Sequence, residues 1–302
     1  MARATATKAR VRQTGRRPQR RAAVRRWALV AGVAAAVLAV AAVVWAVGRG
    51  GDDPAAPVRI EHVHGLGINP ANGVLYAATH HGVFQLPTDG PARRVGDGEQ
   101  DTMGFTVAGA NHFLASGHPA EGHGGPAHLG LIESTDGGVT WRTLSLRGGA
   151  DFHALRFRHD TVYGYNSVTG QLMVSRDRAS WETRATIALR DLVVSPSQPD
   201  TLLATGQRGV LRSTDGGRTW TSAGGPPLAL LDWQRDDRLW GITATGDVVR
   251  STDGGAAWSD AGRMPGPATA FAAHNDDLYA AVHERGIFHS RDAGATWTQL
   301  HP

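Results

Sequence analysis

Short runs of alternating apolar and polar residues recur along most of the chain. Leu75-Tyr-Ala-Ala-Thr is one such run, and Leu202-Leu-Ala-Thr and Leu278-Tyr-Ala-Ala-Val repeat it. Each run is followed by a glycine and an apolar pair, at Gly82, Gly209 and Gly286. Alternation with a period of two, in segments rich in apolar and β-branched residues, predicts β-strands. Its recurrence predicts a fold assembled from similar hairpin units.

A second repeated segment gives the period of these units. Ser134-Thr-Asp136-Gly-Gly-Val-Thr-Trp141 recurs at Ser213–Trp220, Ser251–Trp258 and Ser290–Trp297, and a shortened copy spans Ser175–Trp181. These five serines are 41, 38, 38 and 39 residues apart, which is the period of a four-stranded propeller blade. With a decayed copy at Thr88-Asp89-Gly90, the sequence predicts six units that begin near residues 58, 101, 151, 188, 227 and 267.

The repeated Ser, Asp and Trp residues have a structural interpretation. Asp and Gly suit a tight turn between the third and fourth strands of a unit, and the Ser and Asp side chains can bond backbone groups in that turn. The Trp supplies an apolar body that packs between sheets. We therefore assign a structural role, and no catalytic one, to twelve residues: Ser134, Asp136, Trp141, Ser213, Asp215, Trp220, Ser251, Asp253, Trp258, Ser290, Asp292 and Trp297.

The N-terminal part of the chain has a different composition. Residues 27–47 are 21 residues without a charge, which is long enough for a transmembrane helix, and residues 1–26 carry ten Lys and Arg and no acid. This arrangement predicts a cytoplasmic tail, a single membrane anchor, a linker over residues 48–57 and an extracytoplasmic domain over residues 58–302. A signal peptide, cleaved to release a secreted protein, is the alternative.

Charge and cysteine content narrow the class of the predicted domain. From residue 52 onward the chain has 20 Lys and Arg against 27 Asp and Glu, so this part is acidic although the whole chain has a net charge of +4. An acidic domain does not favour nucleic acid as a partner. Because the sequence contains no cysteine, disulfides, thiolate metal sites and cysteine nucleophiles are excluded.

The Ser-x-Asp-x-Gly-x-x-Trp segments resemble the Asp-box, or BNR repeat, of the sialidase-like superfamily of β-propellers. The whole chain is similar to bacterial exported proteins described as glycosyl hydrolase-like BNR proteins, through stretches such as His62-Val-His64-Gly-Leu and Asp151-Phe-His153-Ala-Leu. The resemblance implies an all-β, six-bladed β-propeller of four-stranded blades, here preceded by a transmembrane helix. It specifies the fold better than an activity, since receptors, glucan hydrolases and photosystem assembly factors share the box.

Sialidase activity is not favoured by the residues present. Sialidases have an Arg-Ile-Pro motif and an arginine triad that binds the substrate carboxylate, whereas this chain has Arg59-Ile60-Glu61 and no recognisable triad. Another glycosidase needs only two carboxylates, for which Asp101 and Asp151 are the candidates. The sequence leaves enzymatic activity open.

Histidines gather at one predicted face of the propeller. His62-x-His64, Asp101-x-Met103 and Asp151-x-His153 occupy equivalent places before the innermost strand of the first three units, so they are expected to converge near the axis. The loops that follow the second strands add further histidines. The predicted metal ligands are His62, His64, His80, His81, Met103, His118 and His153. Imidazole with a thioether suits copper and imidazole with carboxylate suits zinc, and Asp101 or Asp151 can be a ligand or orient a histidine.

Three functions follow from these observations. The first is an extracytoplasmic binding module with a copper or zinc site on this face, and no organic cofactor is indicated. The second is a glycoside hydrolase that acts on envelope or environmental glycans through Asp101 and Asp151. The third is a protein-assembly or receptor propeller without a small ligand. The expected partners are therefore the membrane, reached through the N-terminal helix, and a glycan or a protein.

Overall fold

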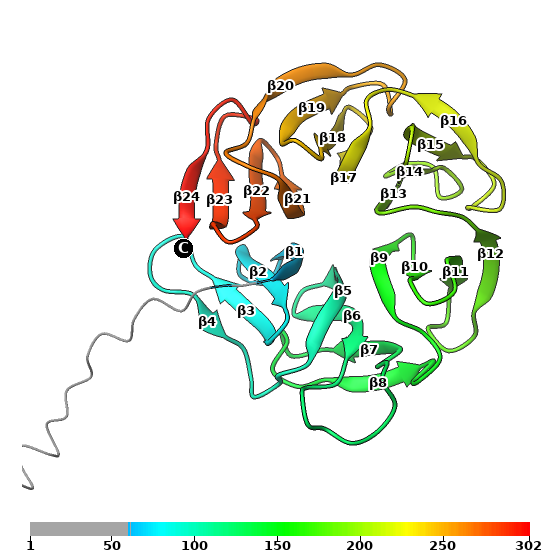
Figure 1. Cartoon of the computed structure of the whole chain (residues 1–302), viewed down its shortest axis with the longest axis vertical. Coiled ribbons are helices and arrows are strands. Elements are labelled where there is room, and N and C mark those ends of the chain that lie inside the picture. Colours follow the sequence, from blue (N-terminus) through cyan, green and yellow to red (C-terminus); the bar gives the residue numbers. More distant parts are fainter. Residues whose placement is uncertain (1–59, 61) are drawn as a thin grey trace, which may run out of the picture. The chain divides into compact units, whose positions relative to one another are not determined.

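A computed structural model describes residue 60 and residues 62–302 of the chain. These residues form a ring of six four-stranded antiparallel sheets, as Figure 1 shows. The predicted six-bladed, all-β propeller is therefore confirmed. Within the described residues, no helix is long and apolar enough to span a membrane. The predicted tail, anchor and linker over residues 1–57 lie outside the described residues.

Each blade consists of four consecutive strands, with each strand paired to the next. The first three blades contain β1 (Val63–Asn69), β2 (Val74–Thr79), β3 (Gly82–Leu86) and β4 (Arg93–Arg94); β5 (Asp101–Gly109), β6 (His112–His118), β7 (Leu131–Ser134) and β8 (Arg142–Ser145); and β9 (Phe152–Arg158), β10 (Thr161–Asn166), β11 (Gln171–Ser175) and β12 (Glu182–Thr186). The last three contain β13 (Leu192–Val194), β14 (Leu202–Gly206), β15 (Gly209–Ser213) and β16 (Thr221–Gly224); β17 (Leu228–Arg235), β18 (Arg238–Thr243), β19 (Asp247–Ser251) and β20 (Ser259–Arg263); and β21 (Ala268–His274), β22 (Asp277–Val282), β23 (Gly286–Ser290) and β24 (Thr298–His301).

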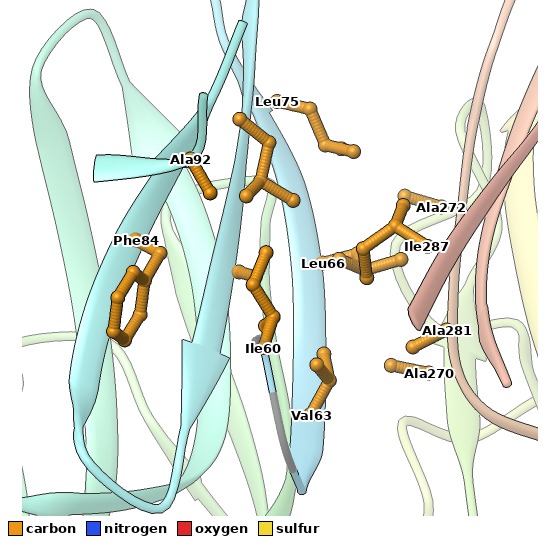
Figure 2. Packing of buried hydrophobic residues seen from close by; sticks show 12 residues of the cluster. Ile60, Val63, Leu66, Leu75, Phe84, Ala92, Ala270, Ala272, Ala281 and Ile287 are labelled. Atoms are coloured by element: carbon orange, nitrogen blue, oxygen red, sulfur yellow. The ribbon is translucent and has the colours of Figure 1, made fainter. Parts of the chain in front are cut away.

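The first strand of every blade is the innermost one, so β1, β5, β9, β13, β17 and β21 surround the axis (Figure 1). The ring closes without a strand shared between the first and last blades. Instead, apolar side chains of both blades pack together, among them Leu66 and Ile287 (Figure 2). The buried His301 ring lies 3.0 Å from the Pro87 carbonyl oxygen, and the Ile60 amide donates to the Pro302 carbonyl oxygen over 3.4 Å. Apolar packing and these two polar contacts therefore join the first and last blades.

The repeated serine turns have the predicted hydrogen bonds. In the turn after β19, Ser251 Oγ accepts a bond from the Gly255 amide over 2.7 Å and donates to Asp253 Oδ1 over 2.8 Å. The same pair of bonds forms at Ser134, Ser213 and Ser290. In the shortened copy, Ser175 donates to Asp177 Oδ1 over 3.1 Å. These bonds lie within the turns that join the third and fourth strands of the blades, where the sequence predicted them.

Candidate metal centre

β-Bulges place three of the predicted ligands. Pairing between β1 and β2 skips His64, pairing between β5 and β6 skips Met103, and pairing between β9 and β10 skips His153. A bulge adds one residue to a strand and changes the direction of its side chain. All three side chains line one cavity of about 420 Å³ in the central channel. The predicted equivalence of these three positions is therefore confirmed.

Close packing between the second and third blades depends on Gly104. A Cβ atom at this position would lie 2.2 Å from the Phe152 carbonyl oxygen, which no side chain could tolerate. Glycine therefore lets β5 approach β9. As a result, Met103 and His153 line the same part of the channel.

Two histidines and one carboxylate form the first group of candidate ligands. His64 Nε2 lies 3.5 Å from His80 Nδ1, and Asp101 Oδ1 lies 3.5 Å from the first atom and 3.1 Å from the second. For comparison, the ligand atoms of a tetrahedral zinc site are about 3.3 Å apart, given bonds of about 2.0–2.1 Å. Asp101 Oδ1 is buried and has no hydrogen-bond partner among the described residues. The geometry of these three atoms suits a metal ion.

Burial keeps His64 in the form that binds metal. Burial lowers the pKa of His64, and the nearby His80, His153 and His62 lower it further, whereas Asp101 opposes the shift. The His64 imidazole is therefore neutral at neutral pH. A neutral imidazole can offer its lone pair to a cation without first losing a proton.

A second group contains His118, His128 and Asp151. Their ligand atoms lie within 4.8 Å of one another, and the rings of His118 and His128 are 5.5 Å apart. His118 ends β6, where it pairs directly with Asp101 on β5. His128 lies at the end of the long loop after β6, held by a bond from the Leu129 amide to the Gly117 carbonyl oxygen. The loop thus brings His128 close to His118, at the end of β6, and to Asp151, directly before β9.

Asp151 is held firmly on one side only. Its Oδ2 atom lies 2.8 Å from His153 Nε2 and accepts a bond from Ser167 Oγ over 3.0 Å. Burial by itself would raise the pKa of Asp151, but the bond from His153, the charge of that ring and the bond from Ser167 together lower it. Its Oδ1 atom is buried and unpartnered among the described residues. Asp151 is therefore an ionised carboxylate with one oxygen available.

The remaining predicted ligands lie around these groups without joining them. His62 packs against His80 and His283, with ring centroids 5.4 and 5.9 Å away, and His81 packs against His80 at 5.9 Å. His153 contacts Asp151, and Met103 faces the channel. The sequence predictions lacked His128 and Ser167 as site residues. The long His-containing loop was a signal for His128, whereas nothing in the sequence pointed to Ser167.

The proposed catalytic acids do come close together, but an imidazole separates them. His118 Nδ1 lies 3.2 Å from Asp101 Oδ2, and His118 Nε2 lies 3.3 Å from Asp151 Oδ2. The ring therefore occupies the space in which a glycosidase would hold the scissile bond. This arrangement favours cation binding over acid–base catalysis by the pair.

Comparisons with known proteins show the fold. No protein-family model matches the chain, and no curated protein matches it. Among solved structures, the GH74 enzyme of Niastella koreensis is similar with a TM-score of 0.58 and 15% identity, over 81% of this chain and 46% of the enzyme. The GH74 xyloglucanase of Xanthomonas campestris has a TM-score of 0.53 and 17% identity, over 80% and 46%. The chain thus spans about half the length of these enzymes.

Propellers from protein complexes are similar to the same degree. A chain of a nidogen/laminin complex has a TM-score of 0.61 and 12% identity, over 76% of this chain and 93% of that chain. YCF48 bound to D1 peptide has a TM-score of 0.51 and 16% identity, over 80% and 83%. At such low identities the likeness extends to architecture alone. The chain is a six-bladed β-propeller whose structural neighbours include glycoside hydrolases and protein-binding propellers.

Proposed function

We propose that this protein is a membrane-anchored, extracytoplasmic propeller of the BNR, sialidase-like type that binds copper or zinc through His64, His80 and Asp101. The triangle of ligand atoms, with sides of 3.1, 3.5 and 3.5 Å, is the observation that carries the proposal. The buried Asp101 Oδ1 supports it, since neither imidazole nitrogen beside this atom makes a hydrogen bond of proper geometry to it, and a buried carboxylate oxygen is costly unless a cation or donor satisfies it. The basic N-terminal tail and the apolar segment at residues 27–47 support the location.

The surroundings of this group suit a metal that also holds an external ligand. Three protein ligands leave a tetrahedral zinc with one further position, as in sites that bind small molecules. His64 lines the channel cavity, so a molecule in the channel can reach the metal. Met103 lines the same cavity and offers a thioether, which copper accepts more readily than zinc.

Glycoside hydrolysis is the second candidate, because Asp101 and Asp151 flank the same histidine ring, His118, at one end of the channel. Such an enzyme would hydrolyse an envelope or environmental glycan. The Asp151→Asn substitution would abolish this activity whether or not metal is present. A panel of glycosides incubated with metal-free and metal-loaded protein separates the two candidates. Glycoside turnover by the metal-free protein would support the hydrolase. A protein that acts only in protein assembly would hydrolyse no glycoside, with or without metal.

Metal retention tests the proposal directly. The full-length chain, purified in detergent, is stripped with a chelator, reloaded with Zn²⁺ or Cu²⁺, desalted and analysed by elemental mass spectrometry. We expect the wild type to retain metal and the His64→Ala, His80→Ala double variant to lose the metal of this group. His274→Ala is the matched control, because His274 is exposed and lies at the end of β21 away from the candidate site. A metal content in the reloaded wild type that is no higher than background would refute the proposal.

A further inference from the structure

Two buried atoms at the channel rim lack hydrogen-bond partners, and both belong to residues outside the first group of candidate ligands. Asp151 Oδ1 and His128 Nδ1 are both buried, and neither has a hydrogen-bond partner among the described residues. Asp151 is 3% exposed, so water does not hydrate its carboxylate. A buried polar atom without a partner destabilises the folded state, because it has lost its bonds to water. Both residues belong to the group of His118, His128 and Asp151, each of which offers one ligand atom within 4.8 Å of the others, so the group can hold one cation.

The position of His118 adds an independent reason. A neutral imidazole has one N–H, so it can donate to only one of the two carboxylates that its nitrogens face. Its Nδ1 atom lies 3.2 Å from Asp101 Oδ2 in hydrogen-bonding geometry. If Nδ1 carries the proton, the Nε2 lone pair faces Asp151 Oδ2 at 3.3 Å, and two acceptors repel each other. A cation beside Nε2 and Asp151 removes that repulsion.

We infer that the rim holds a second metal ion, bound by His118, His128 and Asp151 and linked to the first through Asp101. In this arrangement Asp101 binds the first metal through Oδ1 and accepts the His118 Nδ1–H bond through Oδ2, while His118 Nε2 binds the second metal. Two imidazoles and a carboxylate again suit Zn²⁺ or Cu²⁺. The inference rests on the proposed function, because the link through Asp101 requires the first metal to be bound.

The link through Asp101 makes a quantitative prediction. A carboxylate that accepts the outer N–H of a metal-bound histidine orients the ring and increases its basicity, and its loss lowers metal affinity about 10–100-fold. Asp101→Asn should therefore abolish the first site and also weaken the second by that factor. His80→Ala should abolish the first site and leave the affinity of the second within about twofold.

Stoichiometry and affinity can be measured together by titrating the chelator-treated, full-length protein with Co²⁺ and with Zn²⁺. We expect the wild type to bind two equivalents of metal, and His80→Ala and His128→Ala to bind one each. The d–d absorption of Co²⁺ reports occupancy of each site. His123→Ala is the matched control, since His123 lies in the same loop outside the group. Circular dichroism verifies that the variants fold.

The outcomes separate the second site from the first. One equivalent in the wild type, lost in His80→Ala and unchanged in His128→Ala, would overturn the second site and leave the proposed function intact. No bound equivalent would overturn both. Two equivalents in the wild type, together with equal second-site affinity in Asp101→Asn and His80→Ala, would overturn the link through Asp101.

Discussion

His118 and Asp101 face each other across the paired strands β6 and β5, with His118 Nδ1 3.2 Å from Asp101 Oδ2. Backbone pairing sets this contact, because the two residues are register partners at the channel end of the second blade. Gly117 allows the approach: a Cβ atom there would lie 2.0 Å from the Asp101 carbonyl oxygen. The strand ends thus hold one ring between two carboxylates.

His153 is expected to act as a positioning residue. It contacts Asp151 Oδ2 and belongs to neither group of ligand atoms. His153→Ala should lower the affinity of the second site about 10–100-fold, whereas His153→Gln, which retains an N–H donor, should recover most of it. Titration with Zn²⁺ measures both. An equal loss in the two variants would instead identify His153 as a ligand.

Met103 should discriminate between copper and zinc. Its side chain lines the same channel cavity as His64, and soft sulfur ligands select Cu(I). Met103→Leu preserves the apolar volume and removes the sulfur, so it should lower Cu(I) affinity by about tenfold and leave Zn²⁺ affinity unchanged. Competition with chromophoric chelators for each metal measures this. Equal Cu(I) affinity in both proteins would show that the sulfur does not bind copper.

The serine turns should contribute to stability and not to metal binding. Ser251→Ala removes the acceptor of the buried Gly255 amide bond, so the free energy of unfolding should fall by about 1–3 kcal/mol. Ser175→Ala is the control, since Ser175 Oγ bonds the Asp177 side chain in a shortened turn. Its substitution should cost less. Urea unfolding monitored by tryptophan fluorescence measures both, and equal losses would contradict the proposed role of the amide bond.

Asp232 should make stability depend on pH. Burial raises the pKa of this channel carboxyl to about 6, with Arg156 and the Ala273 amide opposing the shift. The folded state therefore binds the proton more tightly than the unfolded state, so stability falls as pH rises from about 4 to 6. Asp232→Asn should be more stable than the wild type above pH 6, by at most about 3 kcal/mol, and not at pH 4. Unfolding at pH 4 and pH 8 checks this; a difference independent of pH would contradict it.

The period of the serine segments and the alternating strands were enough to predict six four-stranded blades, because these signals are local and repeat along the chain. The same alignment predicted that His64, Met103 and His153 are equivalent. The way in which the ring closes was not visible in the sequence, since it depends on packing between Leu66 and Ile287, which are far apart in the chain.

By itself, the sequence predicted candidate metal ligands, without His128, and the face of the propeller on which they gather. Only the tertiary structure decided how they are grouped. The bulges, the approach of β5 to β9 and the backbone bond beside His128 position the side chains of the two groups. Residue type and spacing cannot specify such distances, because they arise from contacts between blades. For that reason His153 contacts a carboxylate, while His128, in a loop, completes a group of candidate ligands.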